Sequence, residues 1–188
     1  MVSNLSAASA EALRISVVIP VYNGAATIGR ALDSVLAQQY SAHEVIVVDD
    51  GSQDQTAEVV RSYDGRVRYV RQENAGPSAA RNYGVKLATG DWIAFLDADD
   101  WYYPERLARH ARMIEVDSDL DFLVGNFDYR DAEGQHLHDS MSVTVFGREL
   151  LERYGATGQG VIEQEALGRF IVEQFSDTRT LTLPRRIF

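Results

Sequence analysis

The amino-acid sequence predicts an α/β fold of the Rossmann-like kind, with a mostly parallel sheet and helices on both of its faces. Two patterns indicate this class. Short runs rich in Val and Ile alternate with segments whose apolar residues recur at helical spacing, as in successive βαβ units. The Val- and Ile-rich runs are apolar at consecutive positions, which is typical of strands covered on both faces.

The first two strands and helices are the clearest. Residues 14–23 predict a β-branched strand closed by Pro20, and residues 43–52 predict a second buried strand. Residues 53–63 predict the second helix. The first helix is expected within residues 25–39, where the following apolar residues share one face: Ile28, Ala31, Leu32, Val35 and Leu36.

The remaining elements continue the alternation. Residues 66–72 predict a third strand and residues 76–90 a third helix, with a Pro near its first turn and a Gly just past its end. Residues 91–100 predict a fourth buried strand, and residues 119–127 a fifth. Between these two strands, a helix within residues 103–116 is indicated by one apolar face: Leu107, Ala111 and Ile114.

Composition limits the class of protein. The chain has 188 residues, 45% of them hydrophobic, and a formal net charge of −10, so we expect one globular domain and no nucleic-acid partner. The absence of cysteine excludes disulfides and fits a reducing compartment. No stretch approaches the ~20 apolar residues of a membrane span. We therefore expect a cytoplasmic protein, with any membrane contact made through its substrate, and a flexible lead-in at residues 1–14 without a secretory signal.

Polar and acidic residues follow three of the expected strands. They are Tyr22 and Asn23 after the first, Asp49 and Asp50 after the second, and Asp97, Asp99 and Asp100 after the fourth. Parallel strands end at one edge of a sheet, and ligands of such sheets bind at that edge. The sequence therefore predicts a binding site there.

The residue types indicate the chemistry of the ligand. The chain has neither G-x-G-x-x-G nor G-x-x-x-x-G-K-[ST], so a dinucleotide fold and a P-loop are disfavoured. Asp97 and Asp99 can share a hard divalent cation that offers open positions to phosphate oxygens. Asp49 and Asp50 accept hydrogen bonds but do not donate them while ionised, which suits the N–H and O–H groups of a base or ribose. A nucleoside diphosphate bridged by a metal ion satisfies both pairs.

Four ordered segments carry a resemblance to a known family: VVIPVYNGAATIGRALDSVLAQ, EVIVVDDGSQDQT, NAGPSAARNYGVKLATGDWIAFLDADD and YPERL. Together they resemble the family 2 glycosyltransferases of the GT-A fold, which transfer a sugar from a nucleoside diphosphate sugar to an acceptor with inversion at the anomeric carbon. The resemblance implies a donor-binding core at residues 15–130. It also implies a partial acceptor-side region at residues 131–188, within the same domain.

For the nucleoside end of the donor, the resemblance implies four contacts. Pro20 and Tyr22 would line the pocket of the base. Asp50 would read the base, with Asp49 beside it. Uridine diphosphate is the nucleotide that we expect. The sequence does not indicate whether the acceptor is a glycan, a lipid or a protein.

For the diphosphate end, the resemblance implies five further residues. Asn74, Gly76 and Arg81 would close over the nucleoside and the diphosphate. Asp97 would face the ribose or the shell of the metal ion, and Asp99 would hold Mn²⁺ or Mg²⁺ against the diphosphate.

The catalytic base is the part of the family pattern that the sequence does not show. Inverting transfer needs a carboxylate base near the acceptor hydroxyl, and the family carries it in an acidic segment after a last strand. The segment TLTLPRRIF resembles the strand just before it, so we expect a base beyond Phe188. Glu163, Glu165 and Asp100 are the positions to test within the chain.

Two other functions compete with this interpretation. A non-catalytic module that binds nucleotide sugars is the stronger one, because the base is missing. A phosphoribosyltransferase loop at VIVVDDGSQDQT is disfavoured, since Asp54 would repel a 5′-phosphate. Asp54 is instead expected to cap the helix in residues 53–63.

Simpler roles stay open for several residues. The three aspartates after the fourth strand could be a solvated strand end, and Arg81 could be a surface charge. His136 and His138 would share one strand face and mimic a metal pair, but the turn at DAEG favours a solvated hairpin. Tyr102 and Tyr103 are either acceptor contacts or packing residues.

Overall fold

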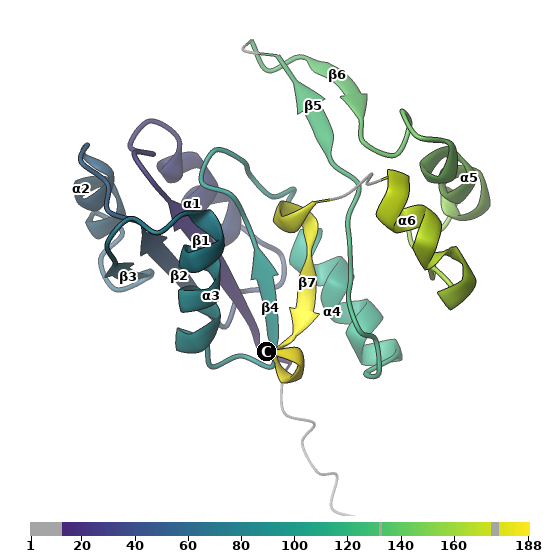
Figure 1. The fold of residues 1–188 in the computed structure, drawn as a ribbon, viewed down its shortest axis with the longest axis horizontal. Helices are drawn as coiled ribbons and strands as arrows, with labels where there is room; N and C mark the ends of the chain where they lie inside the picture. The colour runs from purple at the N-terminus through teal and green to yellow at the C-terminus, as the bar shows by residue number, and fades with distance from the viewer. Residues whose placement is uncertain (1–12, 132, 174–176) are drawn as a thin grey trace, which may run out of the picture.

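The computed structural model describes residues 13–131, 133–173 and 177–188, so the expected lead-in lies almost wholly outside the described residues. Its centre is a five-stranded sheet in the order β3-β2-β1-β4-β7, in which β1 to β4 are parallel and β7 is antiparallel to β4 (Figure 1). The strands are β1 Ile15–Val21, β2 Glu44–Asp49, β3 Arg68–Arg71, β4 Trp92–Phe95 and β7 Thr182–Pro184. This confirms the predicted α/β class with a mostly parallel sheet.

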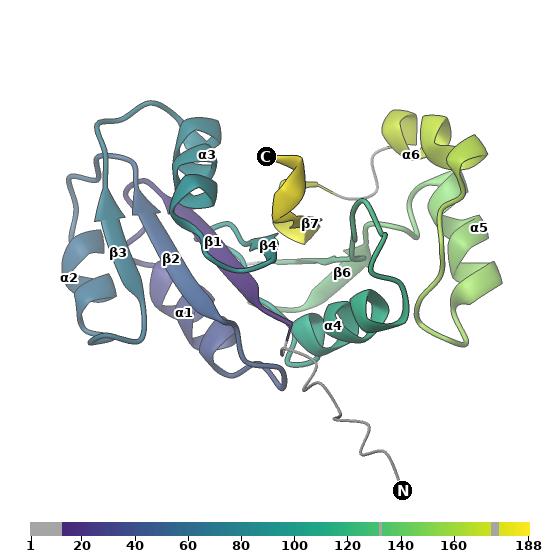
Figure 2. The ribbon, with the colours of Figure 1, turned by 90° about the horizontal axis from the view of Figure 1, so that it is seen from below.

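Helices cover both faces of the sheet, as the sequence predicts (Figure 2). They are α1 Ile28–Leu36, α2 Thr56–Arg61, α3 Pro77–Leu87 and α4 Arg106–Val116. Residues of α1, α2 and α4 pack in one apolar core against one face of the sheet, and residues of α3 pack in a second core against the other face.

Strand β1 shows how the sequence builds these two cores. All seven of its residues are buried. Val17 and Ile19 belong to the core with α1, whereas Val18 belongs to the core with α3, because successive side chains of a strand point to opposite faces. Helix α3 lies very close to β1 at Gly84, where a Cβ would come within 2.4 Å of a methyl of Val18. The apolar run of β1 therefore makes it the central strand.

A second group of elements follows α4 and lies beside the sheet (Figure 1). It contains the antiparallel hairpin of β5 Asp128–Arg130 and β6 His136–Asp139, then α5 Val145–Tyr154 and α6 Leu167–Glu173. Three short 3₁₀ helices complete the described part of the chain: Gln164–Ala166, Thr178–Thr180 and Arg185–Ile187. None of the helices described in residues 13–188 combines the length and the apolar character needed to cross a membrane.

The fifth strand predicted within residues 119–127 is wrong. In this segment the structure has one isolated bridge, in which Leu123 and Thr182 exchange N–H···O bonds of 2.8 and 2.9 Å. The place beside β4 is taken by β7, from much later in the chain. Leu123 is buried against the edge of β7. Burial alone explains the apolar residues of this segment, so the apolar run did not indicate a full strand.

The histidine pair lies on the hairpin that the sequence favours. His136 is exposed and its Nε2 lies 3.6 Å from a carboxylate oxygen of Asp128. The ring of His138 lies 4.6 Å from the ring of Tyr129. Within the residues that the structure describes, no three or more His, Cys, Asp or Glu side chains gather in a group that could hold a metal ion.

Candidate functional site

A cleft of about 680 Å³ opens at the carboxyl ends of β1 and β4, beside the start of α3. Every residue singled out from the sequence as a donor or metal contact lines this cleft, except Asp49. These residues are Pro20, Tyr22, Asp50, Asn74, Gly76, Arg81, Asp97 and Asp99. The parallel strands thus bring together residues that are up to 79 positions apart, from Pro20 to Asp99.

Asp50 shapes one wall of the cleft. Its carboxylate is almost fully buried and accepts hydrogen bonds from the backbone N–H groups of Ala75 and Gly76, at 2.9 and 2.8 Å, and from Nε2 of Gln72 at 2.7 Å. Gly76 has φ = 89° and starts α3, a conformation that favours glycine. A carboxylate has about four acceptor positions, so Asp50 has room for about one further donor.

Asp49 lies behind the cleft and supports it. Its side chain has no solvent exposure. One oxygen accepts the N–H of Ser52 at 2.7 Å, and the other accepts the hydroxyl of Tyr69 at 2.5 Å. Burial, followed by the hydrogen bond to Asp49, raises the pKa of Tyr69 to about 12. These bonds hold the turn after β2, in which Gly51 has φ = 84°.

The turn after β1 is joined to the turn after β2 by side-chain bonds. The N–H of Asn23 donates to Oγ of Ser52 at 2.9 Å, and the side-chain oxygen of Asn23 accepts the N–H of Gln53 at 2.8 Å. Asp54 accepts the N–H of Thr56 at 3.0 Å. It therefore satisfies a backbone donor at the start of α2, as the sequence predicts. The N-cap position itself is one residue later, at Gln55. The hydroxyl of Thr56 is the main cause that lowers the pKa of Asp54.

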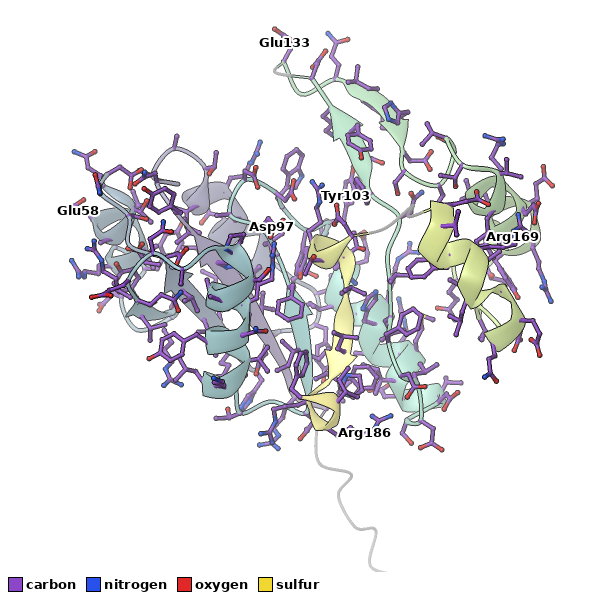
Figure 3. The ribbon with its side chains drawn as sticks, viewed as in Figure 1. Glu58, Asp97, Tyr103, Glu133, Arg169 and Arg186 are labelled. Carbon is purple, nitrogen blue, oxygen red and sulfur yellow. The ribbon has the colours of Figure 1, made fainter. Side chains whose placement is uncertain are left out.

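The acidic segment after β4 contains three carboxylates, of which Asp97 and Asp100 form ion pairs and Asp99 forms none among the described residues. Asp97 forms an ion pair with Arg81, whose Nη2 lies 2.5 Å from its Oδ1. Nε of Arg81 is buried and has no hydrogen-bond partner among the described residues. Asp99 is exposed in the cleft. Figure 3 shows Asp97 at the end of β4 that faces the hairpin.

Arg30 of α1 is a site residue that the sequence analysis missed. Its Nη2 donates to the backbone oxygen of Asp99 at 2.7 Å, and its guanidinium lies 4.0 Å from the centre of the Trp101 ring. Arg30 therefore fixes the backbone from which the carboxylate of Asp99 projects.

Ser34 of α1 and Gln38, two residues past the end of α1, hold the segment that follows. Oγ of Ser34 accepts the N–H of Tyr102 at 3.0 Å, and Nε2 of Gln38 donates to the backbone oxygen of Tyr103 at 2.7 Å. Arg30 and Ser34 are four residues apart on one face of α1, and Gln38 continues this spacing just past the end of the helix. That spacing is the signal in the sequence that could have identified all three.

The two tyrosines have different environments. Tyr102 is buried and donates from its hydroxyl to the backbone oxygen of Phe95 at 2.6 Å, so it is a packing residue. Tyr103 is half-exposed, and its hydroxyl donates to a carboxylate oxygen of Asp128 on the hairpin.

The three carboxylates considered as a base within the chain do not line the cleft. Asp100 is partly buried, which raises its pKa, and its two oxygens accept from Nη1 of Arg179 at 3.3 and 3.0 Å. Glu163 and Glu165 are exposed, the first just before and the second within the 3₁₀ helix that leads into α6. Figure 3 shows Arg169 of α6 well away from Asp97.

Comparisons with known proteins concern the family of the chain. The family model for glycosyl transferase family 2 matches residues 16–172. The chain is 38% identical over 128 residues to the glycosyltransferase GlyA of Streptococcus pneumoniae, which covers 64% of this chain and 18% of GlyA. It is 37% identical over 147 residues to the succinoglycan biosynthesis protein ExoU of Rhizobium meliloti, which covers 76% of this chain and 39% of ExoU.

Solved structures give the same result for the fold. Residues 1–349 of S. aureus TarS in complex with UDP match with a TM-score of 0.59 and 30% sequence identity, over 70% of this chain and 40% of that one. The mannosyltransferase PcManGT of Pyrobaculum calidifontis, in complex with GDP-Man and Mn²⁺, matches with a TM-score of 0.53 and 27% identity, over 63% and 36%. The chain spans less than half the length of these relatives. Its sequence, its GT-A architecture and the match over residues 16–172 show that it belongs to glycosyl transferase family 2.

Proposed function

We propose that the cleft binds a nucleoside diphosphate sugar, with UDP as the nucleotide, and that the chain is the donor-binding part of a glycosyltransferase. The observation that carries this proposal is the meeting of Asp50, Arg81 and Asp99 in one cleft of about 680 Å³. TarS, a relative of the same fold, binds UDP in a solved structure. The cleft is also of the size that suits a small ligand.

The nucleoside end is assigned to the wall formed by Pro20, Tyr22 and Asp50. Tyr22 is half-exposed and offers an aromatic face beside Pro20. The remaining acceptor position of Asp50 can take an N–H of the base. Asn74 and Gly76 lie on the loop that Asp50 holds, so base binding and loop position are coupled.

The diphosphate end is assigned to Arg81 and the acidic segment after β4. Arg81 is the one cation among the described residues that line the cleft, and its buried Nε still lacks a partner there. Arg81 orients Asp97 through their ion pair. Asp99, which Arg30 positions through the backbone, is free to face a ligand.

The residues present fit a divalent cation. Asp99, with Asp97 beside it, would hold Mn²⁺ or Mg²⁺, because carboxylate oxygens suit hard cations and Mg²⁺ is commonly held by one or two carboxylates plus substrate phosphates. When bound, the ion would supply positive charge to the departing diphosphate.

Transfer itself is proposed to proceed by single displacement with inversion. Asp100 is paired with Arg179, and Glu163 and Glu165 lie outside the cleft, so we assign the role of base to none of them. We therefore expect slow release of UDP from UDP-GlcNAc by this chain. Asp100→Asn, Glu163→Gln and Glu165→Gln should release UDP at the rate of the unmodified chain. A drop of about a hundredfold in one variant would identify that residue as the base.

Calorimetric titration of the chain with UDP, GDP, CDP and TDP tests donor binding, with Mn²⁺ and with excess EDTA. We expect UDP to bind most tightly and to bind weakly in EDTA, because the acidic cleft repels a bare diphosphate. Equal affinity for UDP in Mn²⁺ and in EDTA would rule out a metal-bridged donor. No binding of any nucleotide would rule out the donor site.

A non-catalytic module that binds nucleotide sugars remains the second candidate. The ion pair of Asp100 with Arg179 and the exposed positions of Glu163 and Glu165 favour it. Binding of UDP with Mn²⁺, together with no release of UDP from UDP-GlcNAc above the rate in buffer, would support the module over the enzyme.

A further inference from the structure

A second cavity, of about 450 Å³, lies beside α4 and shares no lining residue with the donor cleft. We call it the α4 cavity. It is enclosed by α4, residues 124–126, α5 and residues 155–162. Much of its wall is apolar: Met113, Val124, Met141, Leu150, Leu151 and Ile162.

Arg106, which lines the α4 cavity, has a guanidinium without a carboxylate partner in the part of the chain that the structure describes. Nη1 of Arg106 donates to the imidazole of His110, with Nδ1 at 2.8 Å, and Nη2 donates to the backbone oxygen of Thr180. The guanidinium lies 5.2 Å from the centre of the Tyr102 ring. The ion pairs found within the described residues do not include Arg106.

The charge of Arg106 is not offset by its neighbours. Burial first, and the charge of Arg106 second, lower the pKa of His110 well below its usual value, so His110 is neutral. Arg109 adds a second cation to the wall. Among the described residues that line the cavity, Glu105 is the one carboxylate, and it makes no ion pair with Arg106. Because a guanidinium keeps its charge and an unpaired buried charge is destabilising, the arrangement favours an anion.

We propose that the α4 cavity binds an alkyl phosphate, with the phosphate at Arg106 and the alkyl chain along the apolar wall. A guanidinium matches the geometry of phosphate oxygens, and the apolar side chains of the lining offer contacts to hydrocarbon. Arg109 also lines the cavity and adds a second positive charge for the phosphate.

The position of the cavity suggests what such a ligand would do. A smaller pocket of about 80 Å³ shares Tyr103, Arg106 and Asn126 with the α4 cavity and extends to Asp100. Asp100 directly follows Asp99 of the donor cleft. An alkyl phosphate held at Arg106 would therefore lie next to the donor. The use of the alkyl phosphate as a sugar acceptor rests on the proposed function. The binding of the alkyl phosphate in the α4 cavity does not.

The test is calorimetric titration with octyl phosphate in EDTA, below its micelle concentration. We expect 1-octanol and inorganic phosphate each to bind at least about tenfold more weakly than octyl phosphate, because each lacks one half of the ligand. Arg106→Gln should lose at least about tenfold in affinity for octyl phosphate. Arg112→Gln is the matched control, because Arg112 is exposed on the same helix and does not line the cavity; it should bind octyl phosphate normally.

Titration of the same variants with UDP and Mn²⁺ separates the two proposals. Normal UDP affinity in Arg106→Gln shows that the variant is folded. UDP binding without octyl phosphate binding would overturn the α4 site alone, and the reverse would overturn the donor site alone. Equal octyl phosphate affinity in Arg106→Gln and the unmodified chain would also overturn the proposal.

Two further outcomes have a defined meaning. Inorganic phosphate that binds as tightly as octyl phosphate would overturn the alkyl part of the proposal. If Arg106→Gln fails to fold, the NMR signals of the His110 ring in the unmodified chain decide: octyl phosphate should shift them, and unchanged signals at saturating ligand would overturn the site.

Discussion

The donor cleft and the α4 cavity differ in the sign of their charge. The cleft presents Asp50, Asp97 and Asp99 with one cation, Arg81, that already pairs with Asp97. The α4 cavity presents Arg106 and Arg109, and its guanidinium at Arg106 has no carboxylate partner among the described residues. From this difference we expect an anionic ligand to enter the α4 cavity directly and to need a cation in order to bind in the cleft.

The two regions also differ in what holds their shape. The wall of the cleft at Asp50 is built from hydrogen bonds between a buried carboxylate and the loop at residues 72–76. The α4 cavity lies between α4, α5 and residues 124–126, and much of its lining is apolar. Loss of one carboxylate should therefore disturb the cleft much more than the cavity.

The largest effect is expected from Asp50→Ala. It leaves the N–H groups of Ala75 and Gly76 without their acceptor, so the free energy of unfolding should fall by about 3 kcal/mol. Affinity for uridine should fall about tenfold to a hundredfold. Urea denaturation and calorimetry measure the two effects, with Glu58→Ala, an exposed acid on α2 (Figure 3), as the control. Uridine affinity equal to that of the unmodified chain would show that Asp50 does not contact the base.

The next effect separates the two regions by their need for a metal ion. Asp99→Asn should remove most of the gain in UDP affinity that Mn²⁺ gives, because the amide is a poorer ligand than a carboxylate for a hard cation. Uridine affinity should not change, since uridine has no phosphate. Octyl phosphate affinity should not change either. If Asp99→Asn weakens uridine and UDP equally, Asp99 contacts the nucleoside instead of the ion.

A smaller effect is expected from Arg30→Met, which removes the bond to the backbone oxygen of Asp99. Looser placement of this carboxylate should lower UDP affinity in Mn²⁺ about threefold to tenfold. Binding in EDTA should stay unchanged, which distinguishes positioning of Asp99 from a direct contact with UDP. Arg30→Lys should recover part of the loss. An unchanged UDP affinity in Mn²⁺ would show that the backbone holds Asp99 without Arg30.

The smallest effect is expected only at high pH. There the ionisation of Tyr69, behind the cleft, can be compared with that of Tyr102, near the α4 cavity. Burial is the main cause that raises the pKa of Tyr69 and of Tyr102 to about 12, against about 10 in the unfolded chain. The folded state therefore favours the protonated phenols, so their contribution to stability is complete below pH 10 and is lost as the pH rises toward 12.

Absorbance at 295 nm during a pH titration should show two of the nine tyrosines ionising last. Tyr69→Phe and Tyr102→Phe should each remove one late step. Urea midpoints should be constant from pH 7 to pH 9 and should fall between about pH 10 and pH 12. Nine tyrosines that ionise together near pH 10 would contradict the burial of both residues.

Much of the donor cleft could be predicted from the sequence, because its residues lie directly after strands with a strong apolar pattern. Once β1 and β4 are recognised as parallel, Tyr22 and Asp99 must lie at one edge. Asp49 shows the limit of this reasoning. It is adjacent to Asp50, but successive side chains of a strand point to opposite faces, so one carboxylate lines the cleft and the other supports the turn behind it.

The sequence by itself determined the α/β class, the order of the first four strands and helices, and the edge at which the polar residues gather, because these depend on local periodicity and on the rules of parallel sheets. Only the tertiary structure decided that β7 occupies the place beside β4 and that α1 positions Asp99 through Arg30. It also decided that Arg106 faces a cavity and has no carboxylate partner within the described residues. These features depend on contacts between residues 69 or more positions apart, and no local pattern of residue types specifies which distant segments meet.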